Sequence, residues 1–179
     1  MPVAAIQWSG LTHIIHLELY VDSDGTLATS VMSPDATALI AAAHTNRVKA
    51  LICLEANGPQ TVFNQAIEDN LSVLVSNIMT VVNTYGYDGV DIDWEPVSTG
   101  GFDNDATSAA DMKTFAQALR TALGSKLLTV AAMGADPVYW GSSANASFDR
   151  IDVMTYDLCD TEGSFPWYNS ALFGSGKTA

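Results

Sequence analysis

The sequence predicts an α/β fold of the (β/α) TIM-barrel type, built on a parallel sheet. Apolar segments alternate along the chain with longer segments of helical periodicity, as is typical of strands joined by right-handed helical crossovers. The spacing between the apolar segments suits such a barrel. A complete barrel of eight units needs about 250 residues, whereas this chain has 179. We therefore expect an incomplete barrel of about five units.

Residues 1–179 are expected to form a single domain. Hydrophobic residues make up 48% of the chain, which is enough for a sizeable core, and no segment rich in Pro, Gly or Ser divides it. Its predicted strands are apolar segments of the kind that is buried in a parallel sheet. They span residues 11–19, 48–54, 89–95, 127–133 and 151–156.

Two predicted helices follow the first two strands. Ser33 can cap a helix that runs to residue 44, and Pro34 suits its first position, where a missing N–H costs nothing. Residues 61–85 have apolar side chains at helical spacing, and Gly86 is placed to end this helix.

Two further helices are predicted in the second half of the chain. Residues 107–123 place Met112, Phe115 and Leu119 along one helical face. Residues 137–141 are expected to form a short helical turn.

The charge of the chain restricts its partners. A formal net charge of −13 repels nucleic acid and anionic membranes. It suits a neutral or cationic substrate, although solubility alone explains it equally well. No apolar run reaches membrane-spanning length. The start, MPVAAIQWSG, lacks the basic region of a signal peptide, so either a signal was removed or the chain is a piece of something larger.

Cysteine and histidine give no sign of a metal site or a disulfide framework. The two cysteines, Cys53 and Cys159, lie in or just after apolar runs, which favours buried free thiols over a bridge. No Cys/His spacing is typical of zinc. We expect no metal and no organic cofactor.

The segment that carries chemistry runs from residue 87 to 95, with the sequence YDGVDIDWE. Because side chains alternate along a strand, Asp91, Asp93 and Glu95 share one face. Val90, Ile92 and Trp94 share the other, where they can pack on helices. Neighbouring carboxylates in a buried site cannot all ionise, so one should hold a proton, as a general acid must. The alternative is a solvated edge strand with surface acids, which the flanking apolar residues disfavour.

This segment resembles glycoside hydrolase family 18, the chitinases and related endo-N-acetylglucosaminidases. The family signature D-x-x-D-x-D-x-E is filled by Asp88, Asp91, Asp93 and Glu95. The run WSGLTHIIH is similar to the second barrel strand of the family, and DRIDVMTYDL to the sixth. The resemblance therefore implies about strands 2 to 6 of eight, with few residues left for the others.

The resemblance also implies a retaining, substrate-assisted hydrolysis of β-1,4-linked N-acetylglucosamine polymers. Glu95 would protonate the glycosidic oxygen, and the 2-acetamido carbonyl of the substrate would attack the anomeric carbon. Asp93 would orient the acetamido N–H, and Asp91 would share a proton with Asp93. The remaining implied substrate contacts are Tyr156, which would donate to the acetamido carbonyl, together with Met154 and Asp157. Asp88 would organise the strand entry.

The sequence departs from the family pattern at several positions. The third strand usually ends S-x-G-G, but residues 53–56 read CLEA here. Glu55 is left open as a sugar contact, a crowded misfit or a surface residue. Glu18 stands where the family has an aromatic or small residue. Trp140 and Trp167 either stack on sugar or pack locally.

Two other functions stay open at this point. A lectin-like relative would bind chitin without turnover, and an endo-β-N-acetylglucosaminidase would act on glycans. The resemblance implies a secreted protein whose partner is chitin or an N-acetylglucosamine oligosaccharide. A partial barrel has unpaired sheet edges, so we expect self-association if the native chain ends here.

Overall fold

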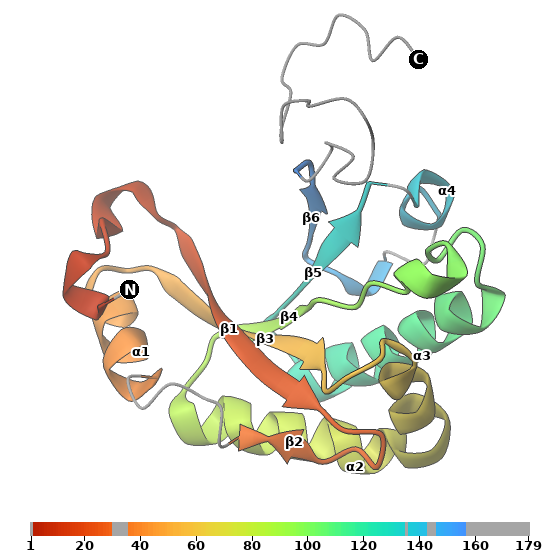
Figure 1. The fold of residues 1–179 in the computed structure, drawn as a ribbon. Helices are drawn as coiled ribbons and strands as arrows, with labels where there is room; N and C mark the ends of the chain where they lie inside the picture. The colour runs from red at the N-terminus through yellow and green to blue at the C-terminus, as the bar shows by residue number, and fades with distance from the viewer. Residues whose placement is uncertain (1, 30–35, 135, 143–145, 157–179) are drawn as a thin grey trace, which may run out of the picture.

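A computed structural model describes residues 2–29, 36–134, 136–142 and 146–156. It contains a six-stranded sheet in the order β2-β1-β3-β4-β5-β6 (Figure 1). Strands β1, β3, β4, β5 and β6 are parallel, and β2 pairs antiparallel with β1 at one edge. The strand bounds are β1 His13–Val21, β2 Leu27–Ala28, β3 Lys49–Ala56, β4 Gly89–Ile92, β5 Leu127–Met133 and β6 Arg150–Met154. The prediction of an α/β fold with a parallel sheet is confirmed, and the described sheet is open, not a closed barrel.

The helices also follow the predicted order. Their bounds are α1 Ala36–Thr45, α2 Thr61–Tyr85, α3 Ala106–Leu123 and α4 Pro137–Trp140, with short 3-10 turns at Val3–Ala5, Trp8–Gly10 and Val97–Thr99. The bounds of α2 are those expected, and Gly86 caps it in the left-handed conformation. The predicted cap of α1 by Ser33 and Pro34 lies outside the described residues.

The hairpin of β1 and β2 was not predicted. Its turn packs on α2, where Asn77 Nδ2 donates a hydrogen bond to the Gly25 carbonyl over 2.9 Å. Helix α2 is kinked at Asn70, whose backbone is non-helical, and the Asn70 side chain donates to the Ser23 carbonyl. The hairpin therefore covers the kink.

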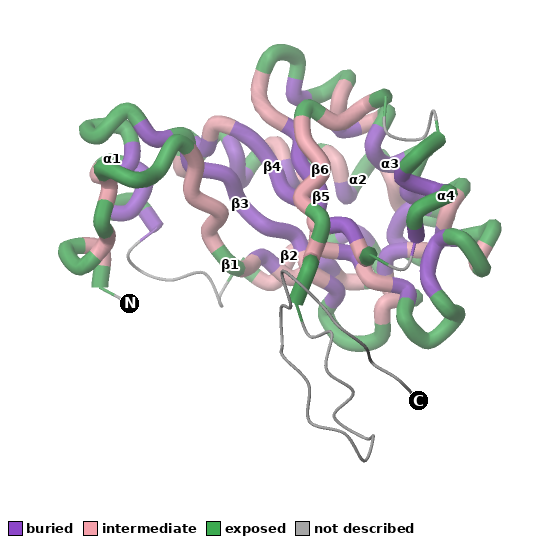
Figure 2. The backbone as a smooth tube through the Cα atoms, turned by 90° about the horizontal axis from the view of Figure 1, so that it is seen from above, coloured by how far each residue is buried: buried purple, intermediate pink, exposed green. Residues whose placement is uncertain are grey.

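The outer face of the sheet packs on α2 and α3, which run side by side along it (Figure 1). Val90, Ile92 and Trp94 are fully buried there, as the alternation predicts. Phe63 of α2 stacks on Trp94 at 5.0 Å between ring centroids and contacts Phe115 of α3 at 6.1 Å. Figure 2 shows the buried residues concentrated in the central strands and the adjoining helices. This core fixes the orientation of β4.

Within the described residues, no helix is both long enough and apolar enough to span a membrane.

Candidate active site

Strand β4 is held close to its neighbour β5. A Cβ atom at Gly89 would lie 2.2 Å from the Leu127 carbonyl oxygen, so only glycine fits there. In the register, Asp91 lies between Cys53 of β3 and Thr129 of β5. We call the face that carries these three side chains the inner face.

The predicted strand over residues 89–95 is too long at its C-terminal end, because β4 ends at Ile92. The Asp93 N–H still donates to the Leu54 carbonyl over 2.9 Å, and then the backbone leaves the sheet. The alternation of faces nevertheless continues, since Trp94 is buried on the outer side. Asp93 and Glu95 follow the strand at its carboxyl end, where parallel sheets build their active sites.

Asp88 lies at the opposite end of β4. Its carboxylate accepts hydrogen bonds from Lys49 Nζ at 2.7 Å, from His44 Nε2 at 2.8 Å and from the Ala50 N–H at 2.9 Å. Burial alone would raise the pKa of Asp88, but these three partners stabilise the carboxylate and hold the pKa below its usual value. Asp88 thus anchors the entry of β4 and lies away from Glu95.

Asp91 is only 3% exposed. Its carboxylate accepts hydrogen bonds from the Thr129 hydroxyl and, at 3.8 Å, from the Cys53 thiol. Burial, and then the charges of Asp152 and Asp93, raise the pKa of Asp91 to about 6. Within the part of the chain that the structure describes, Asp91 and Asp93 are not hydrogen-bonded to each other.

Asp93 is half-buried. Its Oδ1 atom is buried and has no hydrogen-bond partner among the described residues. Burial, followed by the charge of Glu18, raises the pKa of Asp93 above its usual value. An uncompensated buried acceptor of this kind is costly, which is typical of a site that awaits a donor.

Two acids that the sequence left unexplained lie beside Asp93. The register of β1 and β3 shifts between His16 and Leu19, so that Leu17 and Glu18 both stand opposite Cys53. Further along, Tyr20 pairs with Glu55. Burial, then a hydrogen bond with Glu18, then the charge of Asp93 raise the pKa of Glu55 to about 7. Glu55 is therefore a half-buried member of the inner face.

Gln60 connects this group to the predicted acid. Its Oε1 accepts the Glu95 backbone N–H at 3.1 Å, and its Nε2 lies 3.5 Å from Glu55 Oε1. Gln60 was not among the predicted site residues. Its place just before α2, in the loop that follows β3, is the signal that could have indicated it, because such loops form the active-site edge of a barrel.

Comparison with known proteins adds to this geometry. Residues 2–179 match the sequence model of glycosyl hydrolases family 18. The chain belongs to this family. Over 112 residues it is 33% identical to a probable endochitinase of Caenorhabditis elegans, covering 58% of this chain and 18% of that protein. Over 103 residues it is 31% identical to chitinase B of Serratia marcescens, covering 52% and 21%.

Solved structures of family 18 proteins share the fold. A chitinase from Bacteroides thetaiotaomicron superposes with a TM-score of 0.76 at 31% identity, over 87% of this chain and 49% of that one. The group IV chitinase of Ostrinia furnacalis superposes with a TM-score of 0.79 over 100% of this chain and 52% of that one. At 19% identity, the latter likeness concerns the fold alone. The chain thus spans about half of these solved structures, which are TIM barrels, and about a fifth of the curated relatives.

Of the remaining predicted family 18 contacts near β6, only Met154 belongs to the strand itself. Met154 pairs with Met133 of β5, and Asp152, two residues earlier on the same face, forms an ion pair with Arg150 at 2.8 Å. Tyr156 lies two residues beyond β6 and is 50% exposed. Asp157 lies outside the described residues.

Trp140 belongs to an aromatic cluster. Its ring contacts those of Tyr139, Phe102 and Phe148 at centroid distances of 4.8, 5.6 and 6.1 Å. The residue is 9% exposed, so the packing alternative accounts for its position. Trp167 lies outside the described residues.

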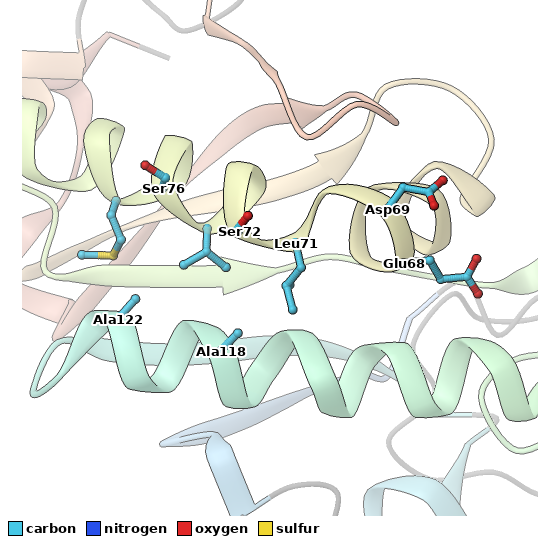
Figure 3. A pocket seen from close by; sticks show the side chains of 9 residues that line it. Glu68, Asp69, Leu71, Ser72, Ser76, Ala118 and Ala122 are labelled. Carbon is cyan, nitrogen blue, oxygen red and sulfur yellow. The ribbon is translucent and has the colours of Figure 1, made fainter.

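A groove between α2 and α3 lies on the outside of the fold. Figure 3 shows its lining, which is mainly apolar and includes Leu71, Val75, Met79, Ala118 and Ala122. The sheet residues of the family 18 signature do not line it. As for metals, the described residues contain no group of three or more His, Cys, Asp or Glu side chains that could hold a metal ion.

Cys53 is buried and free, as the sequence favoured, whereas Cys159 lies outside the described residues. Burial raises the pKa of the Cys53 thiol far above its usual value. This thiol is therefore a weak donor to Asp91, not a nucleophile.

Proposed function

We propose that this family 18 chain carries the catalytic carboxylates for hydrolysis of β-1,4-linked N-acetylglucosamine polymers. The observation that supports the proposal is that Asp91 is buried on the inner face of β4, and that Asp93 and Glu95 follow at the carboxyl end of the strand. Burial raises the pKa of both aspartates. The charged groups that raise these pKa values are themselves carboxylates, Asp152 and Asp93 for Asp91 and Glu18 for Asp93, which suits acid catalysis on a neutral sugar.

The proposed mechanism is substrate-assisted and retains the anomeric configuration. Glu95 donates its proton to the glycosidic oxygen as the bond to the anomeric carbon breaks. The carbonyl oxygen of the substrate's own 2-acetamido group attacks that carbon and forms an oxazolinium ion. Water then opens the ring while Glu95 takes back a proton, so the product has the original configuration.

Asp93 is proposed to accept the acetamido N–H. Its buried Oδ1 atom, which has no partner within the described chain, supports this proposal. A hydrogen bond there would orient the carbonyl for attack and satisfy an otherwise costly acceptor. Asp91 is also proposed to share a proton with Asp93 during the reaction. The raised pKa of Asp91, to which the charge of Asp93 contributes after burial, supports a proton in this pair, although no hydrogen bond joins the two carboxyl groups in the described structure.

The substrate contacts on the side of β6 are also proposals. Tyr156 would donate its hydroxyl hydrogen to the acetamido carbonyl, and Met154 would line the same subsite. Asp157 and Trp140 complete the proposed set, although the burial of Trp140 supports packing more than sugar stacking.

The substitution Glu95→Gln tests the catalytic assignment. It keeps the size of the side chain but removes the proton, so kcat on a chromogenic chitobiose glycoside should fall at least about 100-fold. Glu68→Gln is the matched control, because Glu68 is exposed on α2. Unchanged turnover by a folded Glu95→Gln protein would overturn the assignment.

A non-catalytic, lectin-like binder is the second candidate. Asp91, Asp93 and the carboxyl end of β4 would serve binding of the sugar as well as catalysis, and turnover separates the two functions. Chitin binding by the folded chain, without release of oligosaccharide, would support this candidate over the enzyme.

Self-association and an extracellular site of action are proposed as well. Val153 on the outer face of β6 is 52% exposed, and among the described strands β6 pairs only with β5. Pairing of such edges would bury exposed backbone groups. A monodisperse 19 kDa monomer in light scattering would contradict self-association of this chain.

Polymeric chitin cannot cross a membrane, so recovery of the protein from the cell interior alone would contradict secretion.

A further inference from the structure

Glu55 occupies the end of β3 where family 18 proteins usually have glycine, and it is not an isolated intrusion. Its strand neighbour on β1 is Tyr20, whose hydroxyl donates to Glu18 Oε1 at 2.5 Å. Glu18 in turn lies close enough to Glu55 to be one of the causes that raise the pKa of the Glu55 carboxyl group, after burial.

The chain of hydrogen bonds continues to the proposed acid. Gln60 Nε2 donates to Glu55 Oε1 at 3.5 Å, and Gln60 Oε1 accepts the Glu95 N–H at 3.1 Å. One amide thus contacts Glu55 with its donor end and the Glu95 backbone with its acceptor end. A shift of the Glu55 carboxyl group would move Gln60, and the Glu95 N–H would lose its partner.

We propose that Glu55, paired with Glu18 and acting through Gln60, is a positioning residue that holds the Glu95 backbone at the carboxyl end of β4. The effect of this positioning on catalysis rests on the proposed function. The contacts that hold the Glu95 backbone do not depend on it and can be tested separately. At a position where the S-x-G-G pattern has glycine, this chain thus has Glu55, whose carboxyl group lies next to that of Glu18 and contacts Gln60.

The proposal includes a dependence on pH. The ionisable groups around Glu55 are Glu18 and Tyr20 of β1, Cys53 of its own strand and Asp93 beyond β4; Gln60, on the α2 side, is neutral. All four of these groups are acids, so none of them offsets a charge on Glu55. With its pKa at about 7, Glu55 holds its proton below neutrality and loses it above. Once ionised, Glu55 is repelled by the charges of Glu18 and Asp93 and attracts the Gln60 N–H more strongly, so Gln60 and the Glu95 N–H that it accepts shift together.

Nuclear magnetic resonance can test this without any turnover. The chain has five glutamates, so labelling with ¹⁵N-glutamate gives few backbone signals, and Glu95→Gln identifies that of Glu95. In the unsubstituted protein we expect the Glu95 amide to titrate with a midpoint of about 7. In Glu55→Gln, which keeps the shape but cannot ionise, this titration should disappear, whereas Glu68→Gln should keep it.

Gln60→Ala supplies a second variant that leaves both carboxyl groups in place. The amplitude of the Glu95 titration should fall at least about threefold, because the hydrogen-bonded connection is cut. A Glu95 signal that still titrates near neutrality in Glu55→Gln, or that never titrates in the unsubstituted protein, would overturn the proposal.

Kinetics separate this proposal from the proposed function. With the chromogenic chitobiose glycoside, Gln60→Ala should lower kcat about tenfold and leave KM within about twofold. Glu55→Gln should move the alkaline limb of the pH profile upward, and an unchanged profile would refute the positioning. If the unsubstituted chain shows no turnover, the proposed function fails, while the Glu95 titration still decides the positioning.

Discussion

Replacement of Phe63 by alanine should weaken both the fold and the site. Phe63 is fully buried, stacks on Trp94 at 5.0 Å and contacts Phe115. Removing a buried phenylalanine costs about 3–5 kcal/mol, which includes the cavity that it leaves. For a chain of this size, such a loss lowers the midpoint of thermal unfolding by about 6–20 °C. Because Trp94 lies between Asp93 and Glu95, kcat should fall as well.

Urea unfolding, followed by tryptophan fluorescence, measures this loss. Val73→Ala is the control on the same helix, since Val73 is 44% exposed and its truncation should change the free energy of unfolding by no more than about 0.5 kcal/mol. If Phe63→Ala costs no more than Val73→Ala, the stack of Phe63 on Trp94 does not hold β4 in place. The packing argument would then be wrong.

Two further substitutions test the surroundings of β4. Gly89→Ala should destabilise the protein by at least about 2 kcal/mol in urea unfolding, because its Cβ would meet the Leu127 carbonyl at 2.2 Å. Gly10→Ala, which has open space, should be nearly neutral, and equal effects would contradict the close approach. Asp91 has a pKa of about 6 in the folded protein, above its ordinary value, so the folded state binds its proton more tightly. Stability should therefore rise as the pH falls from about 6 to about 4, by at most about 3 kcal/mol. In Asp91→Asn, the free energy of unfolding should change much less with pH over this range. The same dependence on pH as in the unsubstituted protein would contradict the raised pKa.

The main architecture and the row of acids follow from local patterns. Helix α2 could be bounded because its apolar spacing is regular and Gly86 ends it. The faces of Asp91 and Trp94 followed from strand alternation alone. These features depend on a few neighbouring residues, which is why the sequence predicts them.

Features that depend on contacts between distant segments could not be predicted. Strand β2 has two residues, too few for a periodic pattern. The closeness of Glu18 to Glu55 depends on the shifted register of β1 against β3. Gln60 reaches Glu95 only because the loop after β3 folds back toward the end of β4. The C-terminal end of β4 was misjudged at Asp93 because alternation continues after the ladder has ended.

The two ends of β4 experience opposite electrostatics. At its start, the ion pair of Asp88 with Lys49 and its hydrogen bond with His44, together with the tight fit of Gly89 on β5, fix the strand against sliding. At its finish, like charges crowd together. Because the start of the strand is held in place, the acids at its finish stay close together, and burial and their mutual charges raise the pKa of Asp91, Asp93 and Glu55. The firm attachment of β4 at its start is thus matched by acids at its finish that keep their protons to a higher pH than isolated carboxyl groups do.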